Sequence, residues 1–422
     1  MTASYRNIIG KINYALFFFA LVGLVLPPHY GNMLWLLWLF SWLLEGRWLQ
    51  QTNMRFDKSA IPVLLMVIYL AWALLSMLWA SDMQCAIHAV TRYATLPFLL
   101  LVFSYGLNEN YRDMRFLETF VKACVFIVPA YYFMVHCAVH RDIVLYSQGE
   151  PVPPFHLVFD HGYSSAIKHR LFFCMVLTLG LICIPAIYNR TANRYARWSR
   201  LLTLGIAAAV ILVGIYFTGS RASLLTGVVL FAVALLDRYA DRHHWWVILL
   251  VALGLLAALF VVVKCQPRMR EVATDPRVSI YKSAVIHAPE VPFFGLGIGQ
   301  QKQFMLDNYE DDNYRLGLQR GFNTHNQYIG TYFELGIIGL LLLLAAFISI
   351  PFCFTGRARH IGLLFCLMYL INMFTDDVFE RFDPLTTLYV FMIVILSLQQ
   401  YKSPASFLTD CQFHKQPSVQ EL

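Results

Sequence analysis

Long apolar runs separated by short polar stretches dominate the chain up to about position 400. A helix needs about 20 predominantly apolar residues to cross the hydrocarbon core of a bilayer, and interfacial residues have to complete the shorter runs. The pattern predicts membrane helices near 13–27, 33–44, 60–79, 86–106, 116–138, 170–188, 201–217, 222–236, 245–263, 328–353, 361–374 and 385–399. We therefore expect an all-α, polytopic membrane protein with about twelve transmembrane helices.

The runs divide the chain into four parts. Helices one to nine with short loops are expected over 1–263, a large helical loop over 264–327, helices ten to twelve over 328–399, and a tail over 400–422. The long apolar stretch 201–236 is interrupted by Thr218-Gly219-Ser220-Arg221. We interpret this break as a tight turn between two helices, because an arginine at the centre of a single span would cost about 2.5 kcal/mol or more.

The composition supports a membrane protein. Apolar residues make up 59% of the 422 residues and charged residues 14%, whereas soluble domains average about 45–50% and about 25%. This excludes a soluble enzyme with a single anchor and any disordered or fibrous protein. The nine cysteines show no CxxC or CxxxH spacing, so we expect neither a disulfide framework nor a cysteine metal site.

Lysine and arginine collect in alternate loops, for example in 47–58 and 190–200. Basic residues are typical of cytoplasmic loops, which predicts that both termini are cytoplasmic and that the loop 264–327 lies outside. The same distribution accounts for the net charge of +7, so no nucleic-acid partner is expected. We expect a multi-pass protein of a cytoplasmic membrane that acts as a monomer among membrane lipids.

The polar residues that least fit membrane helices fall on the predicted outer side. Arg221 lies in the turn between two spans, where Gly and Ser neighbours permit the close approach of a ligand. Such an arginine can be an interfacial anchor, or it can bind phosphate with its planar fork of donors. Arg277, Tyr281 and Ala284 share one face of a short amphipathic helix, and Arg277 can be a phosphate ligand or a surface salt-bridge residue.

His325 lies at the predicted outer end of the helix that starts at Tyr328, with Thr324 as a possible N-cap. Histidine can act as a neutral base at ambient pH, although a lone histidine is often structural. Glu334 lies deeper in the same helix. For it we favour a structural role, in which the carboxylate pairs with loop donors or a neighbouring helix.

Four further features need an interpretation. The GxGxG pattern within Pro292–Gly299 follows no strand, and we interpret it as a turn that folds the loop back onto the membrane. The acidic stretch Asp376–Asp383 can hold a divalent cation, as oxygen ligands do, or can form a solvated turn paired with Arg381. Arg92 can contact a lipid phosphate or snorkel to the interface. Gly330, Gly336 and Gly339 are expected at close helix contacts.

The predicted outer location of these residues limits the donors that a reaction there can use. Nucleotide sugars and ATP are absent outside the cytoplasm, so a reaction there must draw on a membrane-borne donor, for which a pyrophosphate-linked lipid is the natural choice. Arginines would neutralise the leaving pyrophosphate, and a histidine would deprotonate an attacking hydroxyl.

Four segments together resemble the O-antigen ligase and polymerase family of bacterial envelope proteins. They are Gly219–Leu225, Arg277 with Tyr281 and Ala284, Pro292–Gly299, and His325–Leu340. Each motif alone is weak, but they share an order, a spacing and a predicted side of the membrane. The resemblance covers about 201–345, and the expected helix layout extends it over most of the chain.

Within that family the chain is most similar to O-antigen ligases. The resemblance implies transfer of a glycan from an undecaprenyl-pyrophosphate-linked donor to a lipid A-core sugar hydroxyl, at a periplasmic site of the bacterial inner membrane. It implies an inverting, metal-independent reaction without a cofactor. It implies that His325, Arg221 and Arg277 are catalytic and that Arg221 and Arg277 bind the donor pyrophosphate. We also expect Tyr281, Asn326, Tyr328 and Arg92 to bind substrate.

Some alternatives remain open at this point. Tyr281 stands where relatives often carry Trp, and an O-antigen polymerase of the same family shares the helix layout and the basic outer loops. A transporter of lipid-linked sugars would show internal repeats and charged residues near the midplane of several helices, and the sequence shows neither clearly. A structural scaffold would tolerate the loss of both Arg221 and His325.

Overall fold

The computed structural model describes residues 3–49, 57–146, 169–187, 194–239, 253–254 and 275–401. The bounds of its main helices are α1 (Ala3–Gly23), α2 (Pro28–Glu45), α3 (Ile61–Ser76), α4 (Met83–Thr91), α5 (Leu96–Tyr105), α6 (Met114–Tyr146), α8 (Arg170–Ile187), α9 (Arg194–Phe217), α10 (Arg221–Tyr239), α12 (Pro276–His287), α13 (Gln301–Asp311), α14 (Arg315–Arg320), α15 (Gln327–Cys353), α16 (Gly356–Met373) and α17 (Phe382–Gln400). The apolar runs predicted these helices apart from α12, α13 and α14, and the run at 86–106 is divided between α4 and α5.

Within the described residues, six helical segments are long and apolar enough to cross a membrane. They are Lys58–Trp79, Met83–Tyr105, Met114–Ala138, Arg170–Ile187, Trp198–Phe217 and Gln327–Cys353. Large side chains such as Phe19, Phe126 and Phe133 are exposed, as lipid-facing positions require. An all-helical membrane protein is thereby confirmed for this part of the chain. The count of twelve spans stays a prediction, and the expected ninth span at 245–263 lies almost wholly outside the described residues.

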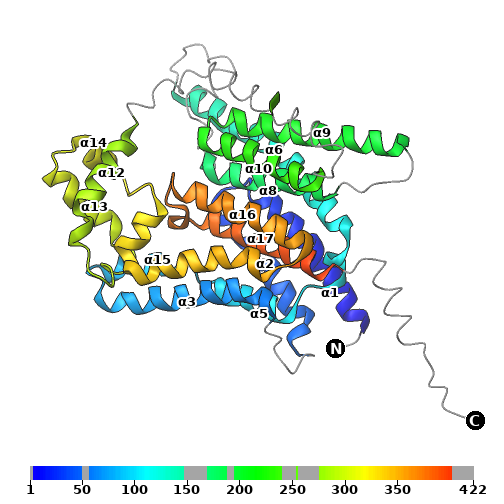
Figure 1. Ribbon diagram of the computed structural model, residues 1–422, viewed down its shortest axis with the longest axis horizontal. Helices are drawn as coiled ribbons and strands as arrows, with labels where there is room; N and C mark the ends of the chain where they lie inside the picture. Colours follow the sequence, from blue (N-terminus) through cyan, green and yellow to red (C-terminus); the bar gives the residue numbers. More distant parts are fainter. Residues whose placement is uncertain are drawn as a thin grey trace, which may run out of the picture.

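The helices α12, α13 and α14 gather at one end of the bundle, and α1 begins toward the opposite end (Figure 1). We name the end that carries these three helices the site end. Helix α8 lies inside the bundle, where it packs against α6, α9, α10, α16 and α17. Almost all of its residues are buried. The expected turn at Thr218–Arg221 is confirmed, since α9 ends at Phe217 and α10 begins at Arg221.

Helix α15 is broken at Gly336, whose φ of 65° and ψ of −165° are not helical. The carbonyl oxygens freed by this break accept hydrogen bonds from outside the helix: Leu296 N–H donates to Phe333 (2.8 Å) and Gly297 N–H donates to Glu334 (2.9 Å). The loop that contains the GxGxG pattern therefore folds back onto a membrane helix, as predicted. It supplies the partners that a bilayer cannot provide.

Two residues complete the contact between this loop and α15. Trp72 of α3 donates its indole N–H to the Leu335 carbonyl at 2.9 Å. The Glu334 side chain is buried, and its carboxylate interacts electrostatically with the backbone N–H groups of Gly299 and Gln301. Glu334 thus lies next to donors of the loop and of the start of α13. Gly336 was expected at a close helix contact, but it lies at the break and its close contact is with the backbone of Phe293 and Phe294.

Replacing Gly336 with alanine is expected to destabilise the protein. Its backbone lies in a region that is essentially restricted to glycine, where other residues cost about 1–3 kcal/mol, and an added Cβ would approach the Phe293 carbonyl oxygen to 2.1 Å. The thermal midpoint of detergent-solubilised protein would report the loss. Gly205→Ala is the matched control, because its Cβ would meet nothing within 4 Å. Equal midpoints for the two variants would contradict the role assigned to the break.

Candidate functional site

His325 lies at the site end, immediately before the N-cap of α15, and neighbouring residues contact its N–H, its carbonyl and its ring. Its φ of 45° is positive, which is uncommon for a residue other than glycine. Its N–H donates to Asn323 Oδ1 at 3.2 Å, and its carbonyl accepts from the Tyr281 hydroxyl at 3.0 Å. The Phe322 ring packs edge-on against the imidazole. A strained residue that its neighbours hold in place is typical of a functional site.

Asp376, in the loop between α16 and α17, fixes the imidazole of His325. Nδ1 of His325 lies 3.2 Å from Asp376 Oδ1. Because an ionised carboxylate can only accept hydrogen bonds, Nδ1 carries the proton and the lone pair of the neutral ring is on Nε2. Among the residues that the structure describes, none forms a hydrogen bond with Nε2 of His325. This nitrogen is therefore available to accept a proton.

The charges around Asp376 favour its ionised form. Burial raises the pKa of the Asp376 carboxyl, but the hydrogen bond from His325 and the nearby His169 and Arg277 outweigh burial and hold this pKa below its usual value. His169, directly before α8, has Nε2 3.8 Å from Asp376 Oδ2. Burial lowers the pKa of His169 to about 4, with Asp376 acting in the opposite direction. The carboxylate thus lies between two imidazoles in a basic environment.

A buried polar network supports the loop that carries Asp376. The Thr324 hydroxyl lies 2.8 Å from Asp377 Oδ1, and Gln301 Nε2 donates to Glu380 at 3.3 Å. Asn323 also donates to Glu380. Burial and the charge of Glu380 raise the pKa of Asp377 well above its usual value. The interpretation of this acidic stretch as a solvated turn was wrong for Asp377, which is 2% exposed.

Metal binding would compete with this network. The carboxylates of Asp376, Asp377 and Glu380 are engaged by donors of the protein itself. Among the described residues, no three His, Cys, Asp or Glu side chains lie where they could share a metal ion. The side chain of Asp383 lies outside what the structure describes.

Three predicted substrate-binding residues hold the backbone near His325. The Tyr281 hydroxyl lies 2.7 Å from the Phe374 carbonyl oxygen, in addition to its contact with His325. Asn326, rather than the expected Thr324, is the N-cap of α15, and its Oδ1 accepts from two backbone N–H groups. The Tyr328 hydroxyl donates to a carbonyl of α16 at 2.7 Å. These hydrogen bonds assign positioning roles, and contact of the three residues with substrate stays a prediction.

The arginines occupy different places. Arg277 lies in the first turn of α12, 3.6 Å from Asp275 and near enough to lower the pKa of Asp376. Arg221 is the first residue of α10, and its side chain lies outside what the structure describes. The turn before it contacts α8, because Thr218 Oγ1 lies 3.0 Å from Cys174 Sγ. Cys174 lies about one helical turn after the start of α8. The residue before α8, His169, lies beside Asp376.

Arg92 lies on the other side of the acidic loop. Its Nη1 donates to the Phe379 carbonyl at 3.2 Å, while Gln327 Oε1 accepts from the Phe379 N–H at 2.6 Å. Both backbone groups of Phe379 are therefore held. Arg92 positions the acidic loop in this structure, and its contact with lipid phosphate stays a prediction.

Sequence reasoning missed the roles of several residues. It considered Asp376 only as a cation ligand or part of a solvated turn, and it did not single out His169. Arg170 and Arg381 act electrostatically on His169, and the Arg381 guanidinium lies 5.9 Å from the Phe172 ring centroid. The available signal was the position of the His169-Arg170 pair, directly before an apolar run on the predicted outer side.

Residues 206–344 match the family model described as O-antigen ligase. The matched segment covers about a third of the chain, from within α9 to within α15. It includes Arg221, Arg277 and His325, whereas Asp376 lies beyond it. The comparison with curated proteins gives no match.

Proposed function

We propose that the protein is an O-antigen ligase, which the match of residues 206–344 to the family model of that description supports. It transfers a glycan from undecaprenyl pyrophosphate to a sugar hydroxyl of lipid A-core. The site end faces the periplasm, and both chain termini lie in the cytoplasm. The reaction inverts the anomeric centre and uses neither a metal nor another cofactor.

In the proposed reaction, Nε2 of His325 takes the proton from the acceptor hydroxyl as its oxygen attacks the anomeric carbon of the donor sugar. The bond between that carbon and the pyrophosphate oxygen breaks, and the lipid pyrophosphate leaves with the electron pair. Asp376 keeps the imidazole in the required tautomer and stabilises the imidazolium that forms. Tyr281 holds the His325 carbonyl and thereby the orientation of the ring.

The leaving group carries several negative charges, and the proposal assigns Arg277 and Arg221 to bind it. A guanidinium forms two parallel hydrogen bonds with phosphate oxygens and remains charged throughout the reaction. The positive charges of Arg170 and Arg381 near His169 favour the same anion. The observation that carries the proposal is the His325–Asp376 pair within this basic environment, with Nε2 unpaired among the described residues.

A gel profile of lipopolysaccharide from a deletion strain, complemented with the wild-type gene, tests the proposed activity. Without the protein, we expect complete loss of glycan-bearing lipopolysaccharide and accumulation of long lipid-linked polymer, both reversed by complementation. Core capped with a single repeat would instead assign a polymerase. A ladder that the deletion leaves unchanged would reject both activities.

Replacing Arg277 or Arg221 with lysine is expected to lower kcat/KM for the donor by about 10- to 100-fold, because one charged hydrogen bond contributes about 1.5–3 kcal/mol. An ammonium keeps the charge but cannot reproduce the fork. Turnover of a purified lipid-linked donor would measure the loss. Arg320→Lys, at an exposed position at the end of α14, is the matched control. Wild-type turnover in both site variants would reject bidentate phosphate binding.

A further inference from the structure

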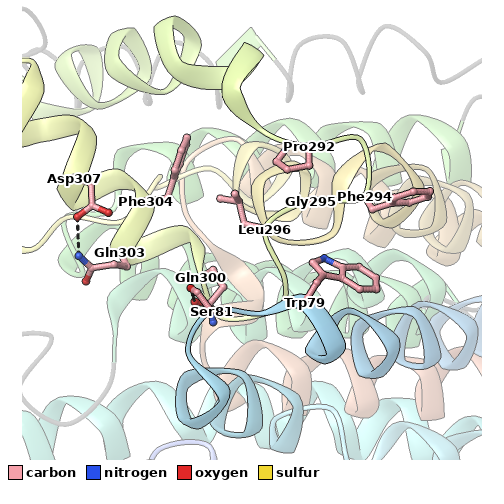
Figure 2. A pocket seen from close by; sticks show the side chains of 10 residues that line it. All are labelled: Trp79, Ser81, Pro292, Phe294, Gly295, Leu296, Gln300, Gln303, Phe304 and Asp307. Atoms are coloured by element: carbon pink, nitrogen blue, oxygen red, sulfur yellow. Dashed lines mark hydrogen bonds between the residues drawn. The ribbon is translucent and has the colours of Figure 1, made fainter.

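A second hollow at the site end is separate from His325. It has a volume of about 680 Å³, within the range of about 300–1,000 Å³ that is typical of small-molecule sites. It lies between the end of α3, the loop before α13, and α13 itself (Figure 2). Because the candidate span Lys58–Trp79 ends there, the hollow lies where the membrane meets water.

Aromatic side chains form the walls of this hollow. The ring centroids of Trp79 and Phe294 are 6.5 Å apart, and both side chains are substantially exposed, at 37% and 52%. Phe304 contributes a third ring, which packs against Phe333 on its other side. Figure 2 shows the Trp79 and Phe294 rings at one end of the hollow, with Leu296 between them and the polar end.

The opposite end presents polar groups. Gln303 Nε2 donates to Asp307 Oδ1 at 2.7 Å, and both side chains are exposed on α13. Gln300 at the floor is already engaged, since its Oε1 accepts from Ser81 at 2.7 Å and its Nε2 donates to the Asp82 carbonyl at 2.9 Å. The floor is therefore fixed. The amide and carboxylate above it have hydrogen-bonding capacity left for a ligand.

This combination fits a sugar. A pyranose ring has an apolar face of C–H groups, which packs on an aromatic ring, and a rim of hydroxyls, which pairs with amides and carboxylates. A phosphate would be repelled by Asp307. A lipid chain would leave the remaining hydrogen-bonding capacity of Gln303 and Asp307 unused. Aromatic residues also gather at membrane interfaces, but an interfacial belt does not require a paired amide and carboxylate facing the rings.

The start of α13 connects the hollow with the loop that carries Asp376. Gln300 faces the hollow, whereas its neighbour Gln301 lies 3.1 Å from Thr324 and donates to Glu380. Thr324 directly precedes His325. A short chain of side-chain contacts therefore connects the hollow with the residue before His325.

We propose that this hollow is a carbohydrate-binding subsite, in which Trp79 and Phe294 stack on an uncharged sugar and Gln303 and Asp307 bind its hydroxyls. The proposal rests on the proposed function for the origin of the sugar, which is a unit either of the donor glycan or of the acceptor core. Whether the sugar belongs to the donor or to the acceptor, the subsite positions the glycan at the site end and does not take part in the chemical step.

The test measures binding separately from transfer. His325→Ala protein in nanodiscs is titrated with two lipid-free probes, a repeat-unit oligosaccharide of the donor glycan and a core oligosaccharide, and binding is followed by saturation-transfer NMR. We expect one probe to bind, and that probe identifies the source of the sugar. Phe294→Ala and Asp307→Ala are each expected to weaken its binding by about tenfold or more. Binding of neither probe would overturn the proposal.

The matched controls are Phe352→Ala and Glu310→Ala, because both side chains are exposed and neither lines the hollow. Equal loss in controls and subsite variants would also overturn the proposal. If Phe294→Ala fails to fold, Gln303→Ala and Asp307→Ala carry the test, since both replace exposed side chains. Failure of the proposed function is distinguishable: wild-type protein would then transfer no glycan, whatever the probes show.

Discussion

Replacing His325 with alanine is expected to lower the rate of glycan transfer by about 10²–10⁴-fold, the usual contribution of a positioned acid or base. The variant keeps the backbone contacts of this residue, because Tyr281 and Asn323 bind its carbonyl and N–H rather than its ring. Donor binding is expected to persist, since the arginines are unchanged. Single-turnover transfer with purified donor and acceptor would measure the loss directly.

His88→Ala is the matched control for this experiment, because His88 is an exposed histidine of α4 outside the site. Its transfer rate is expected to equal that of the wild type. The insertion and thermal midpoint of His325→Ala have to match the wild type for the comparison to hold. If His325→Ala retains full transfer with normal folding, His325 is not the base.

Replacing Asp376 with asparagine is expected to cost about 10²-fold or more in kcat. Asparagine has a similar shape but no charge, so it neither selects the tautomer with Nδ1–H nor stabilises the imidazolium. KM for the donor is expected to change much less than kcat. The double variant with His325→Ala is expected to be no slower than His325→Ala alone, because the two residues act as a unit. Asp311→Asn, at an exposed position on α13, is the matched control.

Transfer in the presence of a chelator tests whether Asp376 orients His325 or binds a divalent cation. If Asp376 orients His325, transfer by the wild type is expected to be unchanged in EDTA, while Asp376→Asn stays impaired. Loss of wild-type transfer in EDTA, restored by a divalent cation, would contradict the metal-independent reaction. Losses in the double variant that simply multiply would contradict the coupling of the two side chains.

Features that depend on a few neighbouring residues, such as turns, could be predicted from the sequence. The break at Thr218–Arg221 was visible as a polar interruption of an apolar run, and Gly219 adopts the positive φ of 69° that a tight turn uses. Glu334 was expected to pair with loop donors because an isolated carboxylate in a membrane helix needs partners. The identity of the N-cap was missed because Thr324 and Asn326 are both suitable capping residues.

The pairing at the site could not be predicted, because it depends on tertiary packing. His325 and Asp376 are 51 residues apart in sequence, and their contact requires that the loop after α16 reach the start of α15. From its composition, the acidic stretch could bind a cation or form a solvated turn. In the structure it is instead part of a buried polar network that holds Asp376 against His325. His169 had no local signal beyond its position before α8. The expected substrate contacts of Arg221 stay predictions, because they concern a side chain outside the described residues.

The break in α15 also has a consequence for biogenesis. The partners of the Phe333 and Glu334 carbonyls, Leu296 and Gly297, precede α15 in the chain, as does Trp72. All of these partners have been synthesised by the time the ribosome reaches α15, so the helix need not wait in lipid with unpaired carbonyl groups. The segment from 293 to 297 thus supplies the hydrogen-bond donors that α15 needs in order to fold in the membrane. The membrane helices and the segment before α13 therefore mature together, and a chain whose 293–297 segment is not in place cannot complete the helix that begins beside His325.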